Sequence, residues 1–134
     1  MDLPKNESSF FLTVVGDTTE RTYDGEFTVI CVPNIMQRRA IEVEKTRFAS
    51  DLKNPTDHLS GLAVCLSNLR VRIVKAPSWW NDSNGGSDLL DENVLVVLYD
   101  KVMSQEDEWR TAVKKKGASE SEDELQGKTQ AERK

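Results

Sequence analysis

The chain has 134 residues, of which 37% are hydrophobic and 31% charged, and its 18 basic and 23 acidic side chains give a net charge of −5. This length is typical of one domain. No run approaches the roughly 18 apolar residues of a membrane-spanning helix. The N-terminal sequence MDLPKNESS lacks the basic and then apolar order of a signal peptide. Net acidity argues against contacts with nucleic-acid phosphates, so we expect no nucleic-acid partner. From the missing apolar run and the missing signal-peptide pattern we expect no membrane partner and no secretion by a signal peptide.

The charge is unevenly distributed along the chain. Residues 117–134 carry five acids and three bases, and Leu125 is their only large apolar residue. Such a stretch buries too little surface to offset the entropy of ordering. We therefore expect an N-terminal arm (1–9), an α+β domain (10–116) and a charged, intrinsically flexible C-terminal tail (117–134).

The domain is predicted to begin with a β-hairpin, because residues 10–15 (FFLTVV) and 26–32 (EFTVICV) are rich in aromatic and β-branched residues. The second run places Phe27 and Val29 on one face and Ile30 on the other. Both faces are largely apolar. We expect one to pack on helices and the other on another chain or on more sheet.

Two helices are expected after the hairpin. Asn34 is a plausible N-cap for the first, which Asn54-Pro55 would end. The second begins near Thr56 or Asp57 and carries the strongest amphipathic stripe of the chain, made of Leu59, Leu62, Ala63, Leu66 and Leu69. Residues 70–74 could extend this helix or form a short strand, and their alternation slightly favours the strand.

A third helix is expected near the C-terminal end of the domain, after a loop over 76–87 that is dense in turn formers. Asp88 or Asp91 would cap it, and Lys114–Lys116 with Gly117 would end it. Its apolar face runs through Val94, Leu98, Val102, Trp109 and Val113. The predicted fold is therefore a β-hairpin packed on about three helices.

No catalytic or metal-binding set is recognisable. His58 is the only histidine, and neither Cys31 nor Cys65 has a sequence that suggests an activated nucleophile beside it. The sequence separations of these three residues do not match a zinc site. We therefore expect His58 to be exposed and both cysteines to be small, buried hydrophobic residues. The segment 82–88 resembles a calcium loop but lacks the Glu at its twelfth position. We expect no enzyme activity, no cofactor and no metal.

Trp79-Trp80 is the most unusual local feature. The two rings could cover the ends of the helices, which we favour, or anchor a protein–protein contact, because Trp is enriched at the energetic centres of interfaces. The residues proposed for an interface are Phe27, Val29, Ile30, Trp79, Trp80 and Leu125.

The chain resembles a group of phage proteins over residues 10–113. The similarity lies in FFLTVVGDTTERTYDGEFTV, in Leu66–Ile73, in Ala76–Trp80 and in Asp91–Val94. These segments resemble small proteins encoded in the virion-structure modules of tailed bacteriophages, some of them tail assembly chaperones and others capsid- or tail-associated components. The resemblance implies a non-enzymatic structural or assembly protein whose partners are other virion or assembly proteins in a symmetric particle. It also implies a location in the virion or, during assembly, in the host cytoplasm.

Two alternatives stay open beside this interpretation. One is a tail assembly chaperone that binds the tape-measure protein and leaves the particle. The other is a small host-directed binding or inhibitor module, for which the tail's acidity offers only weak support. The sequence does not indicate which virion layer is involved.

Overall fold

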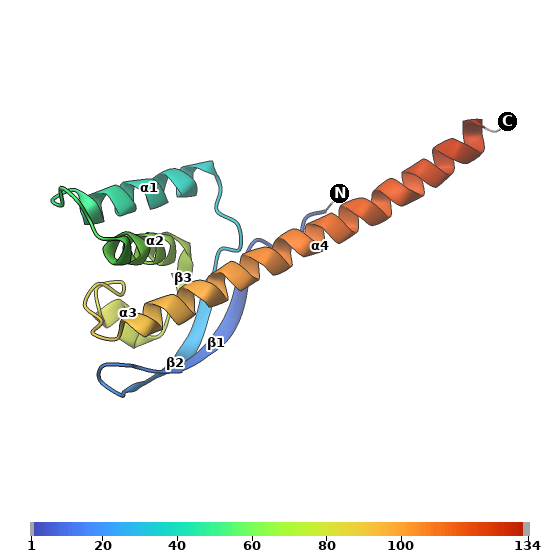
Figure 1. The fold of residues 1–134 in the computed structure, drawn as a ribbon. Coiled ribbons are helices and arrows are strands. Elements are labelled where there is room, and N and C mark those ends of the chain that lie inside the picture. The colour runs from blue at the N-terminus through green and yellow to red at the C-terminus, as the bar shows by residue number, and fades with distance from the viewer. Residues whose placement is uncertain (1, 133–134) are drawn as a thin grey trace.

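The computed structural model describes the backbone of residues 2–132 and the side chains up to Gly117. Its elements are β1 (Ser8–Val15), β2 (Thr22–Val29), α1 (Ile35–Ala49), α2 (Asp57–Arg72), β3 (Ile73–Lys75), α3 (Ser78–Asp82) and α4 (Glu92–Glu132). The predicted α+β class is confirmed (Figure 1).

The strands form one antiparallel sheet in the order β1-β2-β3. The expected hairpin is present, and Phe10 lies opposite Phe27 in its register. The second strand begins at Thr22 and ends at Val29, earlier than the predicted 26–32, because Tyr23 and its neighbours extend the pairing with β1. The polar loop is correspondingly shorter than expected.

Residues 70–74 contain both predicted alternatives, the end of a helix and the start of a short strand. α2 continues to Arg72, and β3 starts at Ile73 and pairs with β2. A short helix, α3, occupies part of the segment that was expected to be loop. Asn34 caps α1 as expected, and Gln37 completes a capping box. Thr56 likewise caps α2.

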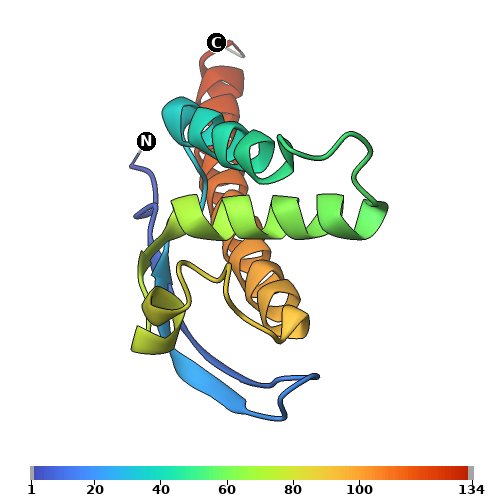
Figure 2. The same cartoon turned by 90° about the vertical axis from the view of Figure 1, so that its left-hand side faces the viewer.

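The helices are layered on one side of the sheet. α4 contacts β1 and α2, and α1 contacts α2, so α1 is the outermost layer (Figures 1 and 2). The core lies between the sheet, α2 and α4, and contains Leu12, Phe27, Val29, Leu66, Leu69, Trp80, Leu95, Leu98 and Val102. It therefore includes members of both predicted helical stripes.

The predicted end of the last helix is wrong. α4 continues through Gly117 to Glu132, a length of about 60 Å at 1.5 Å per residue, and its C-terminal part extends away from the body (Figure 1). Gly117 has no atom near the position of a Cβ, so no tertiary contact enforces a stop there. The predicted flexibility of 117–134 stays a prediction.

The N-terminal arm lies along α4. The indole Nε1 of Trp109 donates to the carbonyl of Pro4 at 3.2 Å, and Nζ of Lys116 donates to the carbonyl of Asp2 at 3.1 Å. Asn6 pairs with both backbone groups of Val32. These bonds tie the arm to α4 and to the segment that follows β2.

A buried arginine joins three parts of the fold. The guanidinium of Arg72, 1% exposed, donates from Nε to the carbonyl of Ile30 at 3.2 Å and from Nη2 to the carbonyl of Cys31. On the side of α4 it lies 3.1 Å from a carboxylate oxygen of Glu106 and 3.6 Å from the sulfur of Met103. Burial lowers the pKa of Arg72, and the adjacent Glu106 partly offsets this effect.

We predict that Arg72→Met destabilises the chain by about 3–5 kcal/mol, because the substitution leaves the carboxylate of Glu106 and two carbonyls without their buried partner. Arg110 pairs with the same Glu106 at 3.0 Å but is far more exposed. Arg110→Met is the matched control and should cost less than about 1 kcal/mol. Urea denaturation measures both losses, and equal losses would contradict the assigned role of Arg72.

Candidate interaction surface

The tryptophan pair is part of an aromatic cluster on the sheet. The ring centroid of Trp79 lies 5.1 Å from that of Tyr23 and 5.6 Å from that of Phe27, both edge to face. Trp80 approaches Phe27 at 6.3 Å. The indole Nε1 of Trp79 donates to the carbonyl of Asp24 at 2.8 Å. These contacts use both rings to hold α3 against β2.

The structure corrects part of the predicted interface. Phe27 and Val29 are 0% exposed and Trp80 is 3% exposed, so these side chains belong to the core and cannot meet a partner in this fold. Ile30 and Trp79 are half-buried and retain some surface. The side chain of Leu125 lies outside the described residues.

A buried carboxylate fastens the hairpin loop to the start of α4. Oδ1 of Asp91 accepts the backbone N–H groups of Thr18 and Thr19, each at 2.8 Å. Its Oδ2 accepts the hydroxyls of Thr19 and Tyr23, each at 2.6 Å. We call this set, Asp91 with Thr18, Thr19 and Tyr23, the Asp91 clasp. Asn93 adds bonds to Asp17 and Val15 beside it.

The clasp depends on charge and on close backbone approach. Burial raises the pKa of the Asp91 carboxyl, but the hydrogen bonds from Thr19, Tyr23 and Thr18 outweigh burial and hold the pKa well below its usual range. The hydrogen bond to Asp91 and burial raise the pKa of Tyr23. A Cβ on Gly16 would lie 2.2 Å from the carboxyl carbon of Asp91, so only glycine fits there.

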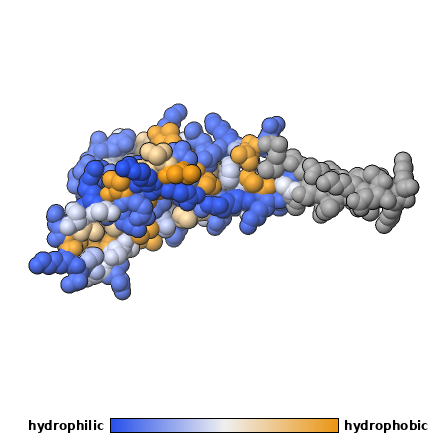
Figure 3. Space-filling model, turned by 90° about the horizontal axis from the view of Figure 1, so that it is seen from above, coloured by the Kyte–Doolittle hydropathy of each residue, from blue (hydrophilic) through white to orange (hydrophobic). Residues whose placement is uncertain are grey.

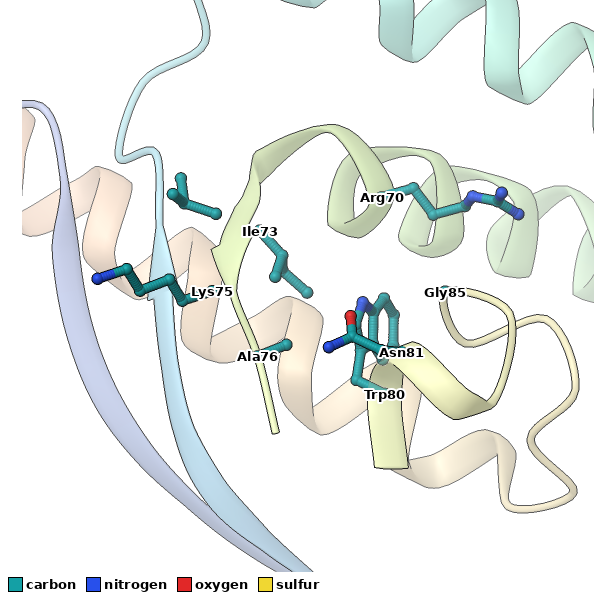
Figure 4. Close-up of a pocket in the computed structure, with 8 residues that line it drawn as sticks. Arg70, Ile73, Lys75, Ala76, Trp80, Asn81 and Gly85 are labelled. Atoms are coloured by element: carbon teal, nitrogen blue, oxygen red, sulfur yellow. The ribbon is translucent and has the colours of Figure 1, made fainter. Parts of the chain in front are cut away.

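A cleft between the end of α2, β3 and α3 does not bring charged side chains together at one point. It measures about 630 Å³ and is lined by Arg70, Ile73, Val74, Lys75, Ala76, Trp80, Asn81 and Gly85. Its cations Arg70 and Lys75 point in different directions (Figure 4). Arg70 already donates to Ser87 at 3.0 Å and lies 3.8 Å from Glu44. The cleft therefore offers no paired cations to an anion.

A second cleft of about 350 Å³ lies between the hairpin and the loop before α4. It is lined by Trp79 and by Asp82 and Asp88 of the calcium-like segment, among others. Among the residues that the structure describes, no group of three or more His, Cys, Asp or Glu side chains could hold a metal ion.

The residues considered for catalysis are dispersed. His58 lies in the first turn of α2, is 66% exposed in its side chain and sits 2.8 Å from Glu92, which confirms its predicted exposure. Cys31 is buried, as expected, whereas Cys65 is only half-buried. Burial raises the pKa of the Cys65 thiol, which makes it a poorer nucleophile.

Large apolar side chains lie on the surface at positions that the sequence analysis did not select. Ile35 and Met36, at the start of α1, are 83% and 66% exposed, and Phe11 in β1 is 64% exposed. A sequence signal existed for Phe11. Because neighbours in a strand point to opposite faces, only one of the adjacent Phe10 and Phe11 can face the core.

No helix within residues 2–132 combines the length and the apolar character that a bilayer crossing needs. A comparison of the chain with protein-family models, curated proteins and solved structures gives no match.

We predict that Asp91→Asn lowers the melting temperature at neutral pH, because an amide cannot accept all four hydrogen bonds of the clasp. The pKa of Asp91 is lower in the folded than in the unfolded chain. Its stabilisation is therefore complete above the unfolded-state pKa of about 3.9 and is lost as the pH falls toward the folded-state pKa.

Thermal denaturation at a series of pH values measures the effect. The gap between the original chain and Asp91→Asn should be widest near neutral pH and should shrink below about pH 4. Asp88→Asn changes an exposed carboxylate nearby and serves as the control. A gap that does not vary with pH would contradict a charged clasp.

Proposed function

We propose that this chain is a non-enzymatic structural or assembly protein of a tailed-bacteriophage particle that acts through protein–protein contacts. The observation that carries the proposal is the exposure of large apolar side chains, above all Ile35 and Met36 on α1. Neighbouring exposed apolar side chains, such as these two, are typical of a surface that a partner covers, whereas singly scattered ones are not.

The position of α1 supports this proposal. α1 is the outermost helix, packs on α2 alone among the other elements with extensive contacts, and buries fully only Ile41. The face of the molecule seen from the side of α1 shows apolar patches separated by hydrophilic surface (Figure 3). Val43 and, near the C-terminal end of the helix, Phe48 are also exposed on α1. We call Ile35, Met36 and Val43 the α1 surface.

The assignment to a phage particle comes from the resemblance over residues 10–113. The dispersed positions of His58, Cys31 and Cys65 are compatible with a role without catalysis. The partners proposed are other virion or assembly proteins, and the location is the virion or the host cytoplasm during assembly. A tail assembly chaperone uses the same kind of contact, but it is absent from mature particles.

Mass spectrometry of purified particles tests the proposal. The chain should be present in stoichiometric amount beside known virion proteins. Its presence only in assembly intermediates would support the chaperone role instead. Its absence from both, with capture of a host enzyme, would support an inhibitor and contradict the proposal.

We predict that the double substitution Ile35→Ser and Met36→Ser reduces incorporation into particles at least about tenfold. Burial of one large apolar side chain is worth about 1.5–3 kcal/mol, and 1.4 kcal/mol corresponds to a factor of ten. The control is Leu90→Ser, because Leu90 is equally exposed but lies outside the α1 surface. Unchanged incorporation of the double variant would show that α1 is not the contact.

A further inference from the structure

β1 is an edge strand with an unpaired side. It pairs with β2 alone. The backbone N–H of Gly16 donates to the carbonyl of Arg21 at 2.8 Å, one step beyond the pairing of Val15 with Thr22. Because hydrogen-bonded pairs alternate along an antiparallel ladder, the backbone groups of Ser9, Phe11, Thr13 and Val15 point away from β2.

Most of this outer edge has no protein partner among the described residues. The carbonyl of Val15 accepts the side-chain amide of Asn93 at 2.9 Å, which occupies that end of the strand. Within the part of the chain that the structure describes, the outward backbone groups of Ser9, Phe11 and Thr13 form no hydrogen bond. These residues are also exposed in their side chains. The free edge is therefore the window Ser9–Thr13.

The window lacks the charge, the proline and the bulge that protect many natural edge strands. Such edges usually carry a charged residue, a proline or a bulge, or they are covered. β1 reads SSFFLTVV and contains no charge, proline or glycine, and its pairing with β2 is continuous over the strand. Phe11, 64% exposed, stands at the middle of the window.

We propose that a second copy of this chain pairs with β1 through the same window, antiparallel, so that two sheets join into one. The two-fold axis would pass at Phe11, opposite Phe11 of the partner subunit, with Ser9 opposite Thr13 of the partner subunit. This register uses only the free outward groups, whereas a register shifted toward Val15 would compete with Asn93. A two-fold contact of this kind closes on itself.

Charge favours a second copy as the occupant. β1 is uncharged, so self-pairing brings no like charges into direct opposition. The nearest acid on the outer face is Glu26, which lies opposite Phe11 on β2. The two copies of Glu26 would be three strand spacings apart, about 14 Å, beyond the screening length of about 8 Å at physiological salt. The phenyl rings would shield each other from water across the axis.

This inference names one partner for the protein contacts proposed above and rests on that proposed mode of action. It concerns a surface distinct from the α1 surface, since β1 lies on the far side of the helical layers from α1 (Figure 1). The test uses purified full-length chain. Its failure would leave the particle experiment unaffected, and absence from particles would leave the dimer standing.

Sedimentation equilibrium over a concentration series should give a mass twice that of one chain. Phe11→Lys should weaken the dimer at least tenfold, because the lysines introduced at position 11 of the two subunits would lie opposite each other and repel. Thr13→Pro removes an outward N–H without removing a bond to β2 and should have the same effect. Val74→Lys introduces the same charge at an exposed position on β3 and should leave the dimer intact. Circular dichroism checks that each variant is folded.

Amide exchange gives an independent readout of the register. In the dimer, the amides of Phe11 and Thr13 should exchange more slowly than in the monomeric Phe11→Lys variant. A chain that stays monomeric at the highest concentration, a dimer that persists in both folded edge variants, or a larger assembly would each overturn the inference.

Discussion

The arrangement of the helices on the sheet depends on the buried guanidinium of Arg72. Arg72 is the last residue of α2, and its side chain binds carbonyls of the segment that leaves β2 and a carboxylate of α4. Its own carbonyl accepts the backbone N–H of Ile30 at 2.8 Å. A cation removed from water must be surrounded by such partners. The desolvation cost thereby selects one relative placement of sheet, α2 and α4.

The sequence could predict those parts of the fold in which local pattern and burial coincide. The repeats that include Leu66 and Leu98 identify the inner faces of α2 and α4, because a helical period leaves one choice of face. Asn34 and Thr56 are recognisable as caps because their partners lie within three residues. The sequence leaves residues 70–74 open between an extension of the helix and a short strand, because the alternating pattern there is short.

The surface was predicted less well, because apolar character alone does not say which side chains a fold leaves outside. Phe27 and Trp80 are among the residues proposed for an interface, and tertiary packing places both in the core; for Trp80 this agrees with the favoured prediction that the tryptophan rings cover the helices. Asp91 was considered only as a helix cap, because its partners in the hairpin loop lie about 70 residues away in sequence. Phe11 was identifiable from its neighbour Phe10. Ile35 carries no comparable signal, since a position beside an N-cap can face either way.

The absence of a side chain at Gly16 has a consequence for how this sequence can vary. The glycine leaves the space that the carboxylate of Asp91 fills, although the two positions lie in separate elements. A residue larger than glycine at 16 is acceptable only where 91 has lost its carboxylate and the hairpin loop has found another anchor. Positions 16 and 91 should therefore covary. A substitution at one of them should be tolerated only together with a compensating substitution at the other.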